Sequence, residues 1–80
     1  MTKAELIDKI ENGSDIMFDV ENRHFTILTW MDEGIAISEQ HPHDGEPQYF
    51  DTAEALVERF KINGKPLGSL SDKVVIVQYT

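Results

Sequence analysis

The residues with the clearest chemical potential are two histidines and an aspartate in one short polar stretch. His41, His43 and Asp44 offer imidazole and carboxylate groups, which are ligands for borderline metals such as zinc. A metal site needs three or four converging ligands, and the remaining histidine, His24, lies far away in the chain. Because Pro, Gly and Asp crowd residues 40–47, we expect an exposed loop there, without a metal or cofactor.

Nucleophilic and phosphate-binding motifs have less support. Residues 63–69 contain glycines and a lysine, but proline follows the lysine and the first glycine of a phosphate-binding loop is missing. Asp32 and Glu33 are adjacent carboxylates in a predicted hairpin turn. Water solvates them there, so we expect ordinary surface acids and not a catalytic pair. The serines lack the strand-turn-helix context of a nucleophile elbow: Ser14, Ser38, Ser69 and Ser71. The sequence therefore predicts a protein that is not an enzyme.

Charge is distributed unevenly along the 80 residues. The chain has 15 Asp and Glu against 7 Lys and Arg, a formal charge of −8. Residues 24–58 contain acids and no base, whereas most of the charges in residues 59–80 are basic. Direct nucleic-acid binding is disfavoured, because its affinity comes largely from Lys and Arg that neutralise phosphates. The partner expected from this balance is a protein.

Two interpretations of the acidic middle section stay open. One is a solvated surface that keeps the protein soluble. The other is an interaction face, with candidate residues Asp32, Glu33, Glu39, Asp44 and Glu46. Acids two positions apart on a strand stand about 6–7 Å apart, on the order of the phosphate spacing of DNA. A DNA mimic that occupies a basic nucleic-acid-binding protein is therefore the alternative function.

Hydrophobic periodicity predicts one α+β domain over residues 1–80. Capping boxes begin at Thr2 and at Asp51, each with a glutamate three residues later, and precede predicted helices over residues 3–11 and 52–60. Alternating residues predict a three-stranded antiparallel meander over 15–20, 23–30 and 35–39. A short extended piece over 48–50 and a helical turn over 66–70 are expected. Two helices should cover one face of a mostly antiparallel sheet, with a C-terminal strand completing it.

Alternation divides the predicted sheet into two faces. The face toward the helices is expected to carry seven apolar residues: Ile16, Phe18, Val20, Phe25, Ile27, Ile35 and Ile37. The opposite face then presents His24, Thr26 and Ala36, together with three larger apolar residues. These three, Met17, Leu28 and Trp30, form a cluster that we name the aromatic patch. Asp15, Asp19 and Ser38 would border it. Either the C-terminal segment or the long loop folds over this patch, or it is a protein-binding or dimerisation site.

The β-branched run Val74–Val77 is apolar on both faces. Such a strand is expected inside the sheet or against a partner rather than at a bare edge. A homodimer is one way to provide that partner.

Cysteine content and hydropathy indicate the cellular compartment in which the protein is expected. The chain has no cysteine, which excludes disulfides and thiolate zinc sites and favours a reducing interior. No stretch approaches the roughly 20 apolar residues that span a bilayer. We expect a cytoplasmic protein without membrane contact.

Three segments resemble small proteins of unassigned function from Gram-positive bacteria and their phages. They are MTKAELIDKIENG at residues 1–13, YFDTAEAL at 49–56 and FKINGKPL at 60–67. In size, acidity and element order the chain is also similar to some phage anti-CRISPR inhibitors that occupy nucleic-acid-binding surfaces. The resemblance implies a phage or prophage protein-binding module and carries over no functional residue. The sequence thus favours a non-enzymatic protein-binding module, with a DNA mimic second and a metal binder or enzyme third.

Overall fold

The computed structural model describes residues 1–40 and 46–80. Helix α1 (Lys3–Asn12) begins at the predicted capping box: Glu5 N–H donates to Thr2 Oγ1 at 3.1 Å, and Thr2 N–H donates to Glu5 Oε1 at 2.8 Å. These bonds satisfy two amides that the first helical turn would leave unpaired. The helix buries Leu6 and Ile10, whose spacing places both on one side.

Helix α2 (Ala53–Arg59) lies where the sequence predicts a helix, but its capping residue differs. Thr52 is the N-cap, and its hydroxyl accepts from Ala55 N–H at 3.0 Å. The prediction of Asp51 as the cap is wrong by one position. An N-cap side chain bonds the amide two or three residues into the helix, and the helix start is set by the buried residues Ala53, Leu56 and Val57.

The described residues form a five-stranded antiparallel sheet, which we name the main sheet. Its strand order is β4-β3-β2-β1-β7, so the predicted meander is confirmed. Glu21 and Asn22 join β1 and β2 with φ of 54° and 60°, the two positive values of a type I′ hairpin turn. The strands are β1 (Asp15–Val20), β2 (Arg23–Leu28), β3 (Ile35–Glu39), β4 (Gln48–Phe50) and β7 (Val75–Tyr79).

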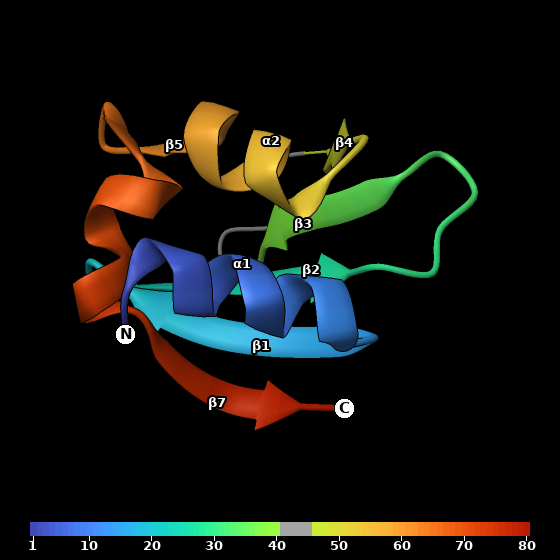
Figure 1. The fold of residues 1–80 in the computed structure, drawn as a ribbon. Helices are drawn as coiled ribbons and strands as arrows, with labels where there is room; N and C mark the ends of the chain where they lie inside the picture. The colour runs from blue at the N-terminus through green and yellow to red at the C-terminus, as the bar shows by residue number, and fades with distance from the viewer. Residues whose placement is uncertain (41–45) are drawn as a thin grey trace.

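Both described α-helices cover the same face of the main sheet, as the sequence predicts (Figure 1). Phe18 and Phe25 stack at 5.3 Å between ring centroids, and Phe60 meets Phe25 edge-on at 5.7 Å. Six of the seven residues expected on this inner face are fully buried, whereas Ile35 is half-buried at its margin. One apolar layer between helices and sheet is therefore the core.

Two segments after α2 differ from the expectation. Residues Lys61–Ile62 (β5) and Lys65–Pro66 (β6) form a small hairpin around Asn63-Gly64, and both turn residues have positive φ. Asn-Gly is the strongest two-residue hairpin signal, but the strands are too short to show alternation. The following 3₁₀ segment η1 (Leu67–Lys73) runs beyond the expected single turn, because Leu67 and Leu70 bury against the helices.

The C-terminal strand lies at an edge of the main sheet, not inside it as the sequence suggested. Within the described part of the chain, β1 is the only strand that β7 pairs with. Ile76 packs against the core, but Val75 and Val77 are 60% and 63% exposed. Val74, the first residue of the predicted strand, is buried just before β7 begins.

Strand β2 is shorter than expected, ending at Leu28 instead of continuing to Trp30. Thr29 anchors the chain there, because its N–H donates to Ser14 O at 3.0 Å and its hydroxyl donates to Gly13 O at 2.5 Å. The segment between β2 and β3 then extends beyond the end of α1 (Figure 1). At its end Gly34 has φ 121°, and a Cβ there would lie 2.7 Å from Phe50 O, so β3 and β4 require glycine at this turn.

A substitution at Ile27 tests whether the apolar layer between helices and sheet supplies most of the stability of the fold. It is completely buried, so we expect Ile27→Val to lower the free energy of unfolding by about 1 kcal/mol through loss of one buried methylene. Denaturant unfolding followed by circular dichroism measures this. Ile76→Val, half-buried on the edge strand, is the matched control and should cost less. Equal losses would contradict a core centred on β1 and β2.

Candidate outer-face site

The face of the main sheet that points away from the helices, here called the outer face, holds the aromatic patch. The register pairs Met17 with Thr26 and Asp15 with Leu28, and alternation turns all four side chains outward. Met17 and Leu28 are half-buried among their neighbours, whereas Trp30 is 61% exposed. The structure therefore brings the three predicted patch residues to one side of the protein.

Trp30 is held in place by a carboxylate at the border of the patch. Its indole Nε1–H donates to Asp15 Oδ1 at 2.8 Å. Asp15 begins β1 opposite Leu28, so the bond draws the indole from the β2–β3 segment back over the end of the sheet. A large aromatic side chain with its polar group bonded and much of its surface exposed is typical of interface anchors.

The C-terminal segment does not cover the aromatic patch. It continues the main sheet beside β1, and its end is fixed there by Thr80 N–H, which donates to Asp15 O at 3.0 Å. At the other side of the outer face, Gln40 Nε2 donates to Thr26 Oγ1 at 3.0 Å. Residues 41–45 lie outside the described residues. Within residues 1–40 and 46–80, Trp30 keeps its large exposed surface.

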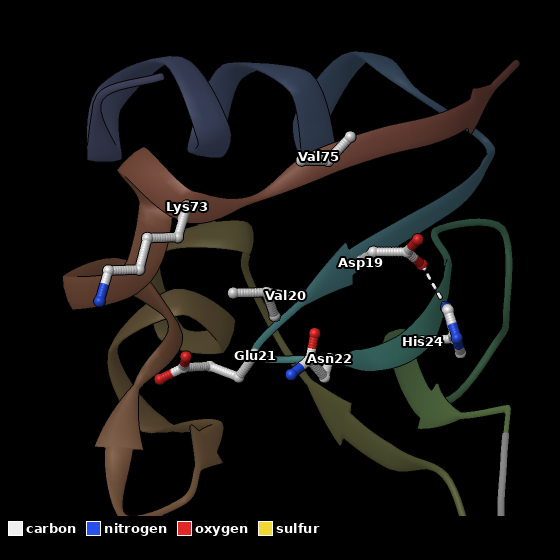
Figure 2. Close-up of a pocket in the computed structure, with 7 residues that line it drawn as sticks. All are labelled: Asp19, Val20, Glu21, Asn22, His24, Lys73 and Val75. Atoms are coloured by element: carbon white, nitrogen blue, oxygen red, sulfur yellow. Dashed lines mark hydrogen bonds and ion pairs between the residues drawn. The ribbon is translucent and has the colours of Figure 1, made fainter.

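A histidine–carboxylate pair occupies the outer face beside the aromatic patch. His24 Nδ1 lies 2.5 Å from Asp19 Oδ1, and the two residues face each other on β2 and β1 (Figure 2). A shallow hollow of about 330 Å³ adjoins this pair toward the β1–β2 turn, with Lys73 and Val75 on its far wall. A second hollow, of about 340 Å³, adjoins it toward Met17 and Val77. The pair thus separates two depressions that run beside β7.

The acidic candidates among the described residues fall at two places: Glu39 and Glu46 line one hollow together with Arg23, and Asp32 and Glu33 lie in the β2–β3 segment. Asp32 and Glu33 are exposed in the segment after Trp30, and Glu46 is exposed just before β4. Asp44 lies outside the described residues. Glu39 is held in a pair: Arg23 Nε and Nη2 donate to its two carboxylate oxygens at 2.7 and 2.6 Å. The structure therefore gives Glu39 a part in joining β2 to β3.

Arg23 sets the chemistry of the Glu39 carboxyl and extends the contact to the small hairpin. The two hydrogen bonds from Arg23 lower the pKa of Glu39 below its usual value and raise the pKa of Arg23 above its own. Arg23 Nη1 also donates to Asn63 Oδ1 at 3.1 Å. One cation thus links the main sheet to the β5–β6 turn.

Some outer-face contacts were missed by the sequence reasoning. Asp19 and His24 were both expected on this side of the sheet but were not paired with each other, although they are the second residue pair out from a two-residue hairpin turn and must face each other. Tyr49 shares the outer face through its pairing with Ala36, and its strand was too short to assign a face. Val75 and Val77 were recognised as apolar, but their exposure follows from the strand order, which the sequence does not contain.

The described residues offer neither a metal-binding cluster nor a membrane-spanning helix. Residues 1–40 and 46–80 contain no group of three His, Cys, Asp or Glu side chains placed to hold a metal ion. The predicted loop cluster of His41, His43 and Asp44 lies outside that range. No helix in the described ranges is both long and apolar enough to cross a membrane.

The Arg23–Glu39 pair predicts a pH-dependent loss of stability. Because the folded-state pKa of Glu39 is lowered, the pair stabilises the fold above about pH 4.3, where an unfolded glutamate titrates. That contribution disappears as the pH falls through the lowered folded-state pKa. We expect Glu39→Gln to cost about 0.5–1 kcal/mol at pH 7, since the pair is partly solvated.

Urea unfolding of both proteins between pH 7 and pH 2 measures this difference. The gap between wild type and Glu39→Gln should close at the acidic end. Glu33→Gln, an exposed acid in the β2–β3 segment and outside the hollow that Arg23 lines, is the control and should leave no gap. A gap for Glu39→Gln that is constant with pH would contradict the assignment.

Trp30 is the only tryptophan, so its fluorescence reports the bond to Asp15 directly. Asp15→Ala removes the acceptor, and we expect stronger acrylamide quenching and lower fluorescence anisotropy because the indole moves more freely. Asp15→Asn keeps an acceptor oxygen and should resemble the wild type. Identical quenching for the wild type and Asp15→Ala would show that this bond does not order the indole.

Comparisons with protein-family models, curated proteins and solved structures found no match to this chain.

Proposed function

We propose that this chain is a non-enzymatic protein-binding module, and that its outer face docks onto a partner surface containing apolar and basic groups. The observation that carries the proposal is the aromatic patch, which residues 1–40 and 46–80 leave uncovered and in which Trp30 is 61% exposed and bonded to Asp15. The indole is ordered before binding, so less conformational entropy is lost when a partner covers it.

The charge of the outer face selects the partner. Asp15 and Asp19 lie on the outward side of β1, about 13 Å apart along the strand, with the apolar Met17 between them. Asp32 and Glu33 add acidic groups in the segment after Trp30. An apolar strip bordered by acids is complementary to a surface on which Lys or Arg flanks apolar side chains.

The alternative function, a DNA mimic, has weaker support. It depends on acids spaced two positions apart along a strand, and none of the strands described here has that spacing. Glu39 and Glu58 of the acidic middle section are also paired, with Arg23 and Lys3. A charge that is divided between strand ends, a turn and α2 imitates a regular phosphate row poorly.

Peptide selection tests the proposed function without a known partner. Random peptides displayed on phage are selected against the immobilised chain, and the binding site of each winner is mapped by ¹H–¹⁵N spectra. We expect selected sequences that combine Lys or Arg with apolar residues, and shifts concentrated on β1 and β2. Trp30→Ala should weaken binding about 30-fold, the effect of about 2 kcal/mol typical of a tryptophan anchor.

Matched variants separate charge from apolar contact. Asp15→Asn with Asp19→Asn should weaken binding and reduce its dependence on salt, because the carboxylates attract the basic groups. Glu54→Gln, an exposed acid on α2 behind the sheet, should leave both unchanged. Peptides that are acidic, or whose shifts lie on α1 and α2, would refute the proposal. Circular dichroism confirms that each variant is folded.

A further inference from the structure

The second unpartnered feature is the free edge of β7. Edge strands present unpaired N–H and C=O groups, and proteins usually protect them with lysine, proline or a covering segment. The five residues of β7, VIVQY, include neither a charge nor a proline. Val75 and Val77 on this strand are more than half exposed, and β1 is its only partner among residues 1–40 and 46–80.

A β-bulge determines which way the β7 side chains point. The register changes from Met17↔Gln78 to Phe18↔Ile76, so β7 has one extra residue, Val77, that no residue of β1 faces. A bulge can protect an edge by bending it, but the residue left without a partner here is a valine. Val75 points to the outer face opposite Asp19, and Val77 lines the hollow beside Met17.

From these observations we infer that β7 pairs antiparallel with β7 of a second copy of this chain. In one register, the outward side chains of both β7 strands stay on the same side of the extended sheet. The two-fold axis then passes near Ile76, and Val75 lies beside the partner's Val77. Each exposed valine then packs beside a valine of the partner on the outer face, and the free backbone groups are paired. This inference goes beyond the proposed function and does not depend on it.

Charge favours a second copy at this edge over the other unpartnered surfaces. A two-fold interface places the residues beside its axis near their own counterparts, so like charges at the axis repel. Packing two outer faces together would oppose Asp15 and Asp19 with the same residues. Pairing through the other edge strand, β4, would bring together Glu46 and Asp51, which flank its three residues. The five residues of β7 carry no charge, although the chain as a whole has a charge of −8. Lys73, two residues before β7, would lie beside the partner's Tyr79 and away from its own counterpart.

The dimer would also enlarge the outer face. Pairing edge to edge about an axis perpendicular to the sheet keeps the helices of both protomers on one side. The two outer faces then form one continuous surface, to which each protomer contributes one aromatic patch. A partner with two-fold symmetry, or with two apolar–basic segments, could then bind both patches with the advantage of linked sites.

Sedimentation equilibrium between 1 µM and 1 mM tests the inference. We expect the mass to rise from 9.1 kDa toward twice that value with concentration. Val77→Lys should raise the dissociation constant at least tenfold, because it places like charges beside the axis. Val77 is exposed and unpaired with β1, so the variant should fold, and its unfolding midpoint measured at micromolar concentration checks this.

Two control variants and one cross-linking experiment show whether the dimer forms through the β7 edge, the β4 edge or the outer face. Gln48→Lys on the β4 edge and Trp30→Ala on the outer face should dimerise like the wild type. Because the chain has no cysteine, mixing Val75→Cys with Val77→Cys should give a mixed disulfide in preference to either self-linked product. A wild type that is monomeric at 1 mM, or a dimer weakened by Gln48→Lys and not by Val77→Lys, would overturn the inference. Loss of peptide binding by Trp30→Ala with the dimer intact would separate this result from that of the proposed function.

Discussion

The structure depends on a single apolar layer between two helices and one face of a sheet. An 80-residue chain has a small interior, and here it is concentrated around Phe18, Phe25 and Ile27, with Leu6, Ile10, Leu56 and Val57 from the helices. Both described α-helices lie on this side. The sheet therefore keeps one face that the described chain does not cover, and its two edge strands, β4 and β7, each pair with a single strand of the described chain.

The uncovered surfaces differ in the residues that they present. The outer face carries an aromatic anchor, half-buried aliphatic side chains and carboxylates that bond to Trp30 and His24. The β7 edge carries exposed valines without charge. Charge near an apolar strip selects partners of opposite sign, whereas an uncharged strand edge permits a second copy of an acidic chain. The −8 charge is thus one reason why we propose a different partner for each surface.

Much of the fold could be predicted from the sequence because its signals are local. Alternation in residues 15–20 assigned Phe18 to the core and Met17 to the outer face, and the Thr2–Glu5 capping box located α1. The β5–β6 hairpin was missed because two-residue strands have no measurable period. The edge position of β7 was missed because strand order depends on pairing between residues far apart in the sequence, such as Ile16 and Tyr79, which are 63 positions apart. The ionic partner of Glu39 was missed for the same reason, since Arg23 reaches it across neighbouring strands.

Hydroxyl-radical footprinting tests the central claim, that the chain works through its uncovered sheet face. The purified chain is oxidised alone and in an extract of the cells that produce it, and the modified residues are counted by mass spectrometry. The account predicts protection of Trp30, Met17 and His24 in the extract, with unchanged oxidation of α1 and α2. Protection that falls on the helices, with Trp30 oxidised equally in both samples, would contradict it.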